Sequence, residues 1–239
     1  MAALTMTFAV RPGPAFRRGF TLVEMAVALL VMALLVAGMM LPLSAQQELR
    51  ARRETENTLN DIREALTGYA AGHAASDGKP YLPCPDTDDD GIQNRSASPG
   101  ACAALEGALP WADLGLGRDD AWNNRFRYRV SAAFSDSGAG FALNGAGDID
   151  VCADSACAAG SKIAGGIPVL VLSHGRNGFG AFNANGFMHA APSDADELEN
   201  ANGDNRFISK SPDGAFDDLV IWLPPSVLIN RMITAGRLP

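Results

Sequence analysis

Three aspartates at alternate positions form the clearest pattern with a chemical meaning in this chain. Asp86, Asp88 and Asp90 stand in the stretch DTDDDG, which ends at Gly91. Alternate carboxylates in a tight turn converge on one point, as they do at the start of a calcium-binding loop. A helix-flanked loop of that kind has an acid at its twelfth position, where this chain has Ala97. The three aspartates are therefore candidate calcium ligands, and a solvated acidic loop is the alternative.

Two other stretches lack the arrangement that catalysis or nucleotide binding requires. Ser173 and His174 are adjacent in LSHG, but neighbouring residues of a strand point to opposite faces, and no Gly-x-Ser-x-Gly turn surrounds the serine. The loop that follows, GRNGFGAFNANG, resembles a Gly-x-Gly-x-x-Gly phosphate loop only loosely and has no helix signal after it. The sequence pairs no nucleophile with a base, so we expect a protein that is not an enzyme.

These candidate residues follow a long apolar run near the N-terminus, residues 20–41 (FTLVEMAVALLVMALLVAGMML), whose one charge is Glu24. A helix of 22 residues is about 33 Å long, close to the thickness of the hydrocarbon core of a bilayer. Arg11, Arg17 and Arg18 precede the run, so the positive-inside rule keeps the N-terminus in the cytoplasm and exports the rest. A signal peptide has a shorter apolar region, of about 7–15 residues. In a plain membrane anchor Glu24 would cost about 2.5–3.5 kcal/mol at the helix centre, which makes it a candidate functional residue.

The stretch RRGFTLVEM resembles the cleavage and methylation signal of type IV prepilins and of the pseudopilins of type II secretion. The match runs from Gly19 to Glu24 without a gap, and the apolar run follows it. The resemblance implies that a prepilin peptidase cuts on the cytoplasmic side between Gly19 and Phe20, and that the new amine of Phe20 is methylated. It also implies that Glu24 meets the terminal amine of a neighbouring subunit, where a buried amine and a buried carboxylate offset each other's cost.

Four cysteines, Cys84, Cys102, Cys152 and Cys157, all lie beyond the apolar run. An even number of cysteines in an exported domain indicates disulfides, and four cysteines allow three pairings. Proximity along the chain favours Cys84 with Cys102 and Cys152 with Cys157. A zinc site is the rival interpretation, but no Cys-x-x-Cys pair occurs and the three histidines are not at ligand spacing.

After Pro42, where we expect a kink because proline removes a helix hydrogen bond, the pattern becomes amphipathic. Apolar residues recur at helical spacing on one face, and charged residues occupy much of the rest. Gly68 and Gly72 mark the end of the helix, and the stretch SDGKP closes it. The face predicted to pack on the globular domain consists of Leu59, Ile62, Leu66 and Tyr69 or Ala70.

Short apolar runs, separated by segments rich in glycine, asparagine and proline, follow the helix and predict strands. The run at 126–134 alternates, whereas the run at 167–173 is continuously apolar and predicts a strand buried on both faces. Residues 205–209 and 217–224 complete a predicted antiparallel sheet, with a shorter edge strand at 147–154. A long helix followed by several strands predicts an α+β fold with the helix packed on one sheet face. The pilin resemblance implies the same architecture.

A second resemblance lies in DAWNNRFRY, residues 120–128, which is similar to the Asp-Pro-Trp-Gly-Asn-Pro-Tyr-x-Tyr motif of major pseudopilins. The C-terminal stretch SPDGAFDDLVIW is similar to the ending of the same proteins. That likeness places Asp213, Asp217 and Asp218 in a region where major pseudopilins bind calcium, with the turn chemistry of aspartate and glycine as the alternative. The residues that match the first motif are Asp120, Trp122, Asn124 and Tyr128.

Together these patterns divide the chain into four predicted segments. They are a prepilin leader (1–19), a transmembrane and assembly helix (20–41), the amphipathic half of the same helix (42–75) and an exported globular β-rich domain (76–239). The formal net charge of −8 argues against nucleic acid as a partner, because phosphate binding needs a basic surface.

The resemblance implies a structural subunit that is cleaved, N-methylated and assembled into a type II secretion pseudopilus or a type IV pilus. Its expected partners are other pilin or pseudopilin subunits, the prepilin peptidase and an inner-membrane assembly platform. Its expected location is the inner membrane, with one span, a cytoplasmic N-terminus and a periplasmic globular domain, and then the filament. The alternative is a low-copy minor pilin that binds or adheres at the filament tip through the segment from Cys84 to Leu116.

Overall fold

The computed structural model describes residues 19–98 and 100–239, and for residues 38–43 it describes the backbone alone. It contains two compact units, one that ends at Gln47 and one that runs from Glu48 to Pro239. Except for Gly19, the predicted leader lies outside the described residues. The boundaries of the four predicted segments stay predictions.

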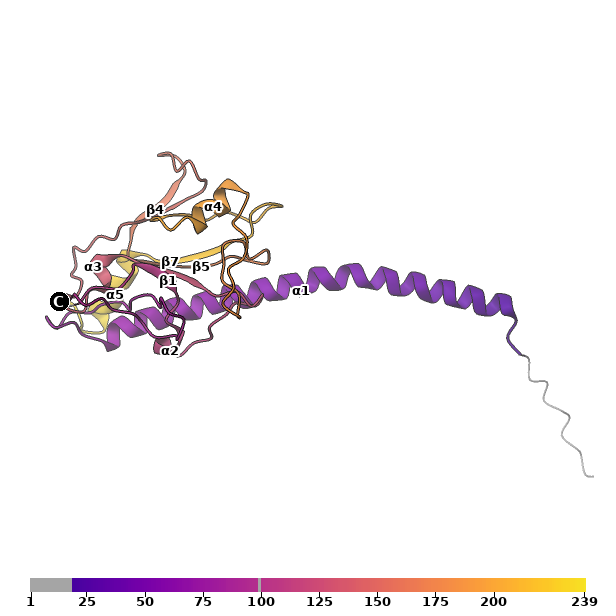
Figure 1. Cartoon of the computed structure of the whole chain (residues 1–239), viewed down its shortest axis with the longest axis horizontal. Helices are drawn as coiled ribbons and strands as arrows, with labels where there is room; N and C mark the ends of the chain where they lie inside the picture. Colours follow the sequence, from indigo (N-terminus) through magenta and orange to yellow (C-terminus); the bar gives the residue numbers. More distant parts are fainter. Residues whose placement is uncertain (1–18, 99) are drawn as a thin grey trace, which may run out of the picture. The chain divides into compact units, whose positions relative to one another are not determined.

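The first helix, α1 (Leu22–Gly72), contains 51 residues and is drawn as one continuous ribbon in Figure 1. Pro42 lies within it and does not end the helix, and the kink expected there stays a prediction. Beyond Glu48 the buried residues recur at every third or fourth position, because side chains with that spacing share a face. This confirms the predicted packing face, whose buried members are Leu59, Ile62, Leu66, Tyr69 and Ala70.

A four-stranded antiparallel sheet forms the middle of the globular unit. Its strands follow one another in the order β1 (Glu106–Ala108), β2 (Arg127–Val130), β5 (Val169–Ser173) and β7 (Leu219–Leu223). The long helix and this sheet confirm the α+β fold with a pilin-like order of elements. Figure 1 shows the part of α1 beyond Glu48 along one side of the sheet, with β4 and α4 on the other side.

The central strand β5 is buried on both faces, as its continuous apolar run predicted. Val169 and Val171 belong to the main core, which also contains the buried face of α1, whereas Leu170 and Leu172 pack against the second sheet. Successive strand residues point to opposite faces. A strand in the middle of three layers therefore needs an apolar side chain at every position.

The second sheet has three strands in the order β4 (Lys162–Ile167), β3 (Ile149–Cys152) and β6 (Arg206–Ile208). Two sequence predictions are wrong here, because residues 205–209 do not join the main sheet and the strand within 147–154 is central rather than an edge. In addition, β6 pairs with β3 in parallel. Alternation shows which side chains point inward but not which strand is the neighbour, so the errors concern pairing rather than the existence of the strands.

A proline explains why the apolar run at 167–173 serves two sheets. Pro168 has no N–H to donate to a ladder and separates β4 from β5. Ile167 consequently pairs with Ile149 in the second sheet, whereas Val169 pairs with Val130 in the main sheet.

Short helices complete the described part of the unit, namely α2 (Trp111–Leu114), α3 (Ala132–Ser135), α4 (Ala195–Ala201) and α5 (Pro225–Thr234). The predicted strand at 126–134 is too long, because β2 ends at Val130 and α3 follows almost at once. Helix α5 is absent from the sequence predictions. Its signals are Pro225 in the first turn and the buried pair Leu228 and Met232, four residues apart.

Candidate functional site

The residues after the expected cut form a hydrogen-bonded cap at the start of α1. The N–H and the hydroxyl of Thr21 both donate to Glu24 Oε2 over 2.9 Å, and the N–H of Glu24 donates to Thr21 Oγ1 over 3.2 Å. This is a capping box, which satisfies amide groups that the helix bonds cannot reach. The Thr-x-x-Glu spacing is its sequence signal, and the resemblance alone does not reveal it. The acid of the motif is thus held at the first turn of the helix.

The apolar side chains around and after the cap are exposed over the described part of the run, from Phe20 to Val36. The predicted span, residues 20–41, ends among positions whose side chains are not described. Within the described part of the chain, no helix combines the length and the hydropathy that crossing a bilayer requires.

Two disulfides lie in the globular unit. Cys84 is joined to Cys102 and Cys152 to Cys157, with Cα atoms 5.3 and 5.4 Å apart. The second disulfide links the end of β3 to the following turn, and Cys152 packs there beside Ile208. Each bond closes a loop of the chain, which restricts the unfolded state more than the folded one.

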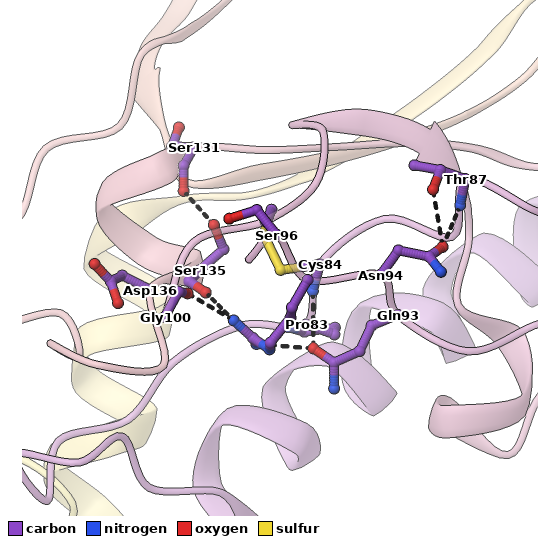
Figure 2. The surroundings of a disulfide bond; sticks show 12 residues. Pro83, Cys84, Thr87, Gln93, Asn94, Ser96, Gly100, Ser131, Ser135 and Asp136 are labelled. Atoms are coloured by element: carbon purple, nitrogen blue, oxygen red, sulfur yellow. Dashed lines mark hydrogen bonds between the residues drawn. A yellow bond between two sulfur atoms is a disulfide. The ribbon is translucent and has the colours of Figure 1, made fainter. Parts of the chain in front are cut away.

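The segment that the first disulfide closes is fixed to the fold by Arg95. Its guanidinium donates to the carbonyl oxygens of Gly100 and Ser135 and to Gln93 Oε1, over 2.8 to 3.0 Å (Figure 2). The side-chain amide of Gln93 then donates to the hydroxyl of Tyr69 on α1 over 2.5 Å. The expected recognition region is therefore bonded to the long helix and does not project as an independent loop.

The aspartates of DTDDDG converge as expected, with one carboxylate oxygen of Asp86, Asp88 and Asp90 within 4.8 Å of the others. Asp86 is buried. Its Oδ1 accepts the N–H groups of Asp88 and Asp89 over 3.1 and 2.7 Å, and its Oδ2 accepts that of Gly91 over 2.7 Å. Burial raises the pKa of this carboxyl. The Asp86 carboxylate therefore orders the turn by binding the backbone N–H groups of the residues that follow it, which is a structural role that needs no cation.

The residues of the 120–128 motif form a buried hydrogen-bonded network. Asp120 Oδ1 accepts the N–H groups of Trp122 and Asn124, both over 2.9 Å, and Oδ2 accepts the hydroxyl of Ser173 over 2.5 Å. The Asn124 amide donates to the carbonyl oxygen of Gly175 over 3.1 Å. Burial raises the pKa of Asp120. The motif thus ties its own turn to the end of β5, and Ser173 serves that purpose rather than pairing with its neighbour His174.

Near the C-terminus, Asp217 and Asp218 meet Glu197 of α4, with one oxygen of each carboxylate within 4.8 Å of the others. Asp213 lies outside this cluster, where it pairs with Lys210 and accepts backbone N–H groups of the following turn. Burial, followed by the neighbouring carboxylates, raises the pKa of both Glu197 and Asp217. Sequence reasoning missed Glu197 because ADELENA has the composition of a solvated acidic helix.

Several buried polar atoms in this cluster have no hydrogen-bond partner, among them Asp217 Oδ1, Asp218 Oδ1 and both ring nitrogens of His174. His174 Nδ1 lies 3.6 Å from Asp218 Oδ1, beyond ordinary hydrogen-bond distance. The amides of Asn177 and Asn200 hold Glu197 Oε1 and Asp218 Oδ2 over 2.8 Å each. Buried acceptors without a donor are costly, and a hard divalent cation is the ligand that fixed carboxylate oxygens suit.

The comparison with family models gives a match at the start of the chain. The prokaryotic N-terminal methylation motif covers residues 15–40. The chain therefore carries the prepilin-type cleavage and methylation signal that pilins and pseudopilins share. Neither the comparison with curated proteins nor the comparison with solved structures gave a match.

Proposed function

We propose that this chain is a prepilin-like structural subunit that is cut between Gly19 and Phe20, methylated on the amine of Phe20 and assembled into a type II secretion pseudopilus or a type IV pilus. The match of the methylation motif to residues 15–40 carries the proposal. The exposed apolar side chains of α1 within the motif, from Leu22 to Val36, support it, because large contiguous apolar surfaces mark contacts with lipid or with other chains.

In this proposal Glu24 receives the terminal amine of a neighbouring subunit. Both hydrogen bonds that its carboxylate accepts from Thr21 use Oε2. A carboxylate has acceptor sites on two oxygens, so Oε1 can accept an ammonium group without breaking the cap. The capping box also fixes the acid in place before the neighbour arrives, which lowers the entropy lost on pairing.

The remaining parts of the proposal concern location and partners. The subunit sits in the inner membrane through the apolar half of α1, with its globular unit in the periplasm, and then enters the filament. The two disulfides support export, because disulfides persist in oxidising compartments. Its partners are the prepilin peptidase, the inner-membrane assembly platform and other subunits. Other enzymes, among them the prepilin peptidase, carry out the cleavage and the methylation, and the subunit itself is not an enzyme.

The proposal also includes a calcium ion at Glu197, Asp217 and Asp218. The observation that favours this cluster over the one at Asp86 is its set of unpartnered buried oxygens. Bound calcium would join α4 to the start of β7, because the three ligands come from those two regions.

A processing assay tests the main proposal. The full chain is produced together with a prepilin peptidase, and its N-terminus is determined by mass spectrometry. The expected product begins with N-methylated Phe20, and Gly19→Leu blocks the cut while Gly13→Leu, a matched change elsewhere in the leader, does not. An intact N-terminus in the wild type would contradict the proposal. Immunolabelling of the filament then separates a subunit found along its length from a tip module found at one end.

A further inference from the structure

The globular unit contains a cavity of about 480 Å³. Its lining residues are far along the chain from the methylation motif and lie outside α1. The cavity lies between the turn that contains Asp88, the first residues of β2 and the loop 180–188. Of the described residues, none from α1 lines it. The proposed function assigns no role to this cavity.

Exposed apolar side chains form one wall of the cavity. Phe182 and Met188 are 49% and 59% exposed, and Phe187, next to Met188 in the chain, is 72% exposed. Three large apolar side chains on one short loop, each with about half or more of its surface in water, form a patch that a monomer alone leaves uncovered.

The charged groups that line the cavity leave a negative balance. Arg125 pairs with Asp89, and Arg127 pairs with Glu106, so both arginines that line the cavity are already neutralised. Asp88 also lines the cavity, is exposed and has no such cation partner among the described residues. The cavity therefore suits a cationic group that is flanked by apolar surface.

The second half of α1 carries a patch of that complementary chemistry. Leu49 is 54% exposed, and Arg50 and Arg53 are both exposed. Arg53 follows Leu49 by four residues and Arg50 by three, which places all three side chains on neighbouring positions of one helix face. Of the salt bridges between described residues, none involves Arg50 or Arg53. The patch is basic in a chain whose net charge is −8.

We propose that the cavity bounded by Asp88, Phe182 and Met188 receives the patch of Leu49, Arg50 and Arg53 from a second copy of the chain. This inference rests on the proposed assembly into a filament and specifies one contact of it. The guanidinium groups would face Asp88, and Leu49 would cover the apolar loop.

The local charges support a second copy as the occupant, because the chain itself carries both the acidic cavity and the basic patch. Identical acidic chains repel each other, so they associate only where local charges are complementary. The two patches are different surfaces of the same chain, and a contact between different surfaces repeats from copy to copy instead of closing into a dimer. Such a contact builds a filament.

Photocrosslinking of the full chain in membranes tests the contact. p-Benzoylphenylalanine replaces Phe182, copies with heavy and light isotope labels are mixed, and the crosslinked peptides are identified by mass spectrometry. We expect crosslinks between chains to residues 45–57. The same probe in place of Ile163, which is 50% exposed on β4, is the matched control and is expected to give none to that segment.

Charge reversal tests the electrostatic part. Arg50→Glu together with Arg53→Glu should lower the crosslink yield about tenfold, because like charges at an interface are strongly unfavourable, and Asp88→Arg in the same chain should restore much of it. Arg231→Glu changes an exposed arginine of α5 and should leave the yield unchanged.

Crosslinks only to other proteins, only within one chain, or to another segment of the second copy would overturn the inference. If filaments form without the crosslink, this contact is wrong and the assembly proposal stands. If the crosslink forms between copies in cells that make no filament, the contact is supported and the assembly proposal fails.

Discussion

The two halves of α1 differ in what covers their apolar side chains. In the first half Leu29 and Leu34 are 65% and 66% exposed, whereas in the second half Ile62 and Leu66 are 0% and 1% exposed. The second half is amphipathic, and the sheet of the same chain buries its apolar face. The first half is apolar on every side apart from Glu24, and its described side chains are exposed. One helix thus contains a segment whose stability is intramolecular and a segment whose apolar surface is left for contacts outside the chain.

The largest expected effect concerns the first half. Glu24→Val should leave membrane insertion intact but reduce incorporation into filaments at least about a hundredfold, because removing one partner of a buried ion pair costs about 3–5 kcal/mol. Glu24→Gln is the matched control for the cap, because glutamine also completes a capping box but carries no charge. We expect Glu24→Gln to fail in assembly as well. Normal incorporation of either variant, measured in purified filaments, would contradict the role of the charge.

A core substitution in the second half should act on folding alone. Ile62→Ala removes a fully buried side chain and should lower the free energy of unfolding by about 3 kcal/mol. Leu29→Ala, on the exposed first half, should leave that free energy unchanged. Urea unfolding of the full chain in detergent, followed by tryptophan fluorescence, measures both. Equal destabilisation by the two substitutions would show that the halves are not energetically separate.

Calcium should stabilise the globular unit and leave the first half of α1 unaffected. At about a hundred times the dissociation constant, binding adds about 2.7 kcal/mol, which raises the melting temperature by roughly 5–10 °C. Glu197→Gln with Asp217→Asn should abolish the shift, whereas Asp88→Asn should preserve it. Thermal unfolding in calcium and in chelator measures the difference. An unchanged melting temperature in the wild type would refute calcium binding. Loss of the shift in Asp88→Asn would place the calcium ion at the cluster of Asp86, Asp88 and Asp90 instead.

The smallest expected effect concerns the buried network that docks on the second half, where the N–H of Ala121 donates to Thr55 of α1 over 3.3 Å. Burial raises the pKa of Asp120, so its contribution is fully present below the unfolded pKa, near 4, and is lost as pH rises through the folded value. Relative to Asp120→Asn, the wild type should therefore lose stability between pH 4 and pH 7. Urea unfolding at several pH values tests this, and a constant difference between the two proteins would refute it.

The sequence predicts helix faces and the start of α1 well because those features depend on local spacing. The recurrence of Leu59, Ile62 and Leu66 specifies the buried face directly, and the run around Val171 specifies a strand covered on both sides. Strand pairing depends instead on contacts between residues far apart in the chain. The residue pattern of β3 or of β6 consequently does not indicate that the two strands pair in parallel.

The candidate cation site shows the same limit. Asp217 and Asp218 stand next to each other in the sequence, but Glu197 lies 20 residues earlier. Glu197 lies in the first turn of α4, which Asp194 caps, and its side chain is buried. Only the tertiary fold therefore brings the three carboxylates together. By contrast, Asp86, Asp88 and Asp90 converge because they share one turn, and the sequence is sufficient to predict this.

The bond between Gln93 and Tyr69 has a mechanical consequence. In the proposed filament, tension would pull each subunit through its long helix, and this bond lies where α1 contacts the segment closed by Cys84 and Cys102. Load that reaches Tyr69 is therefore shared with a covalently closed loop, in addition to the sheet core that Leu59, Ile62 and Leu66 join earlier in the helix. The disulfide limits how far that loop can be drawn out, so the last turns of α1 stay fastened to a part of the globular unit that cannot extend.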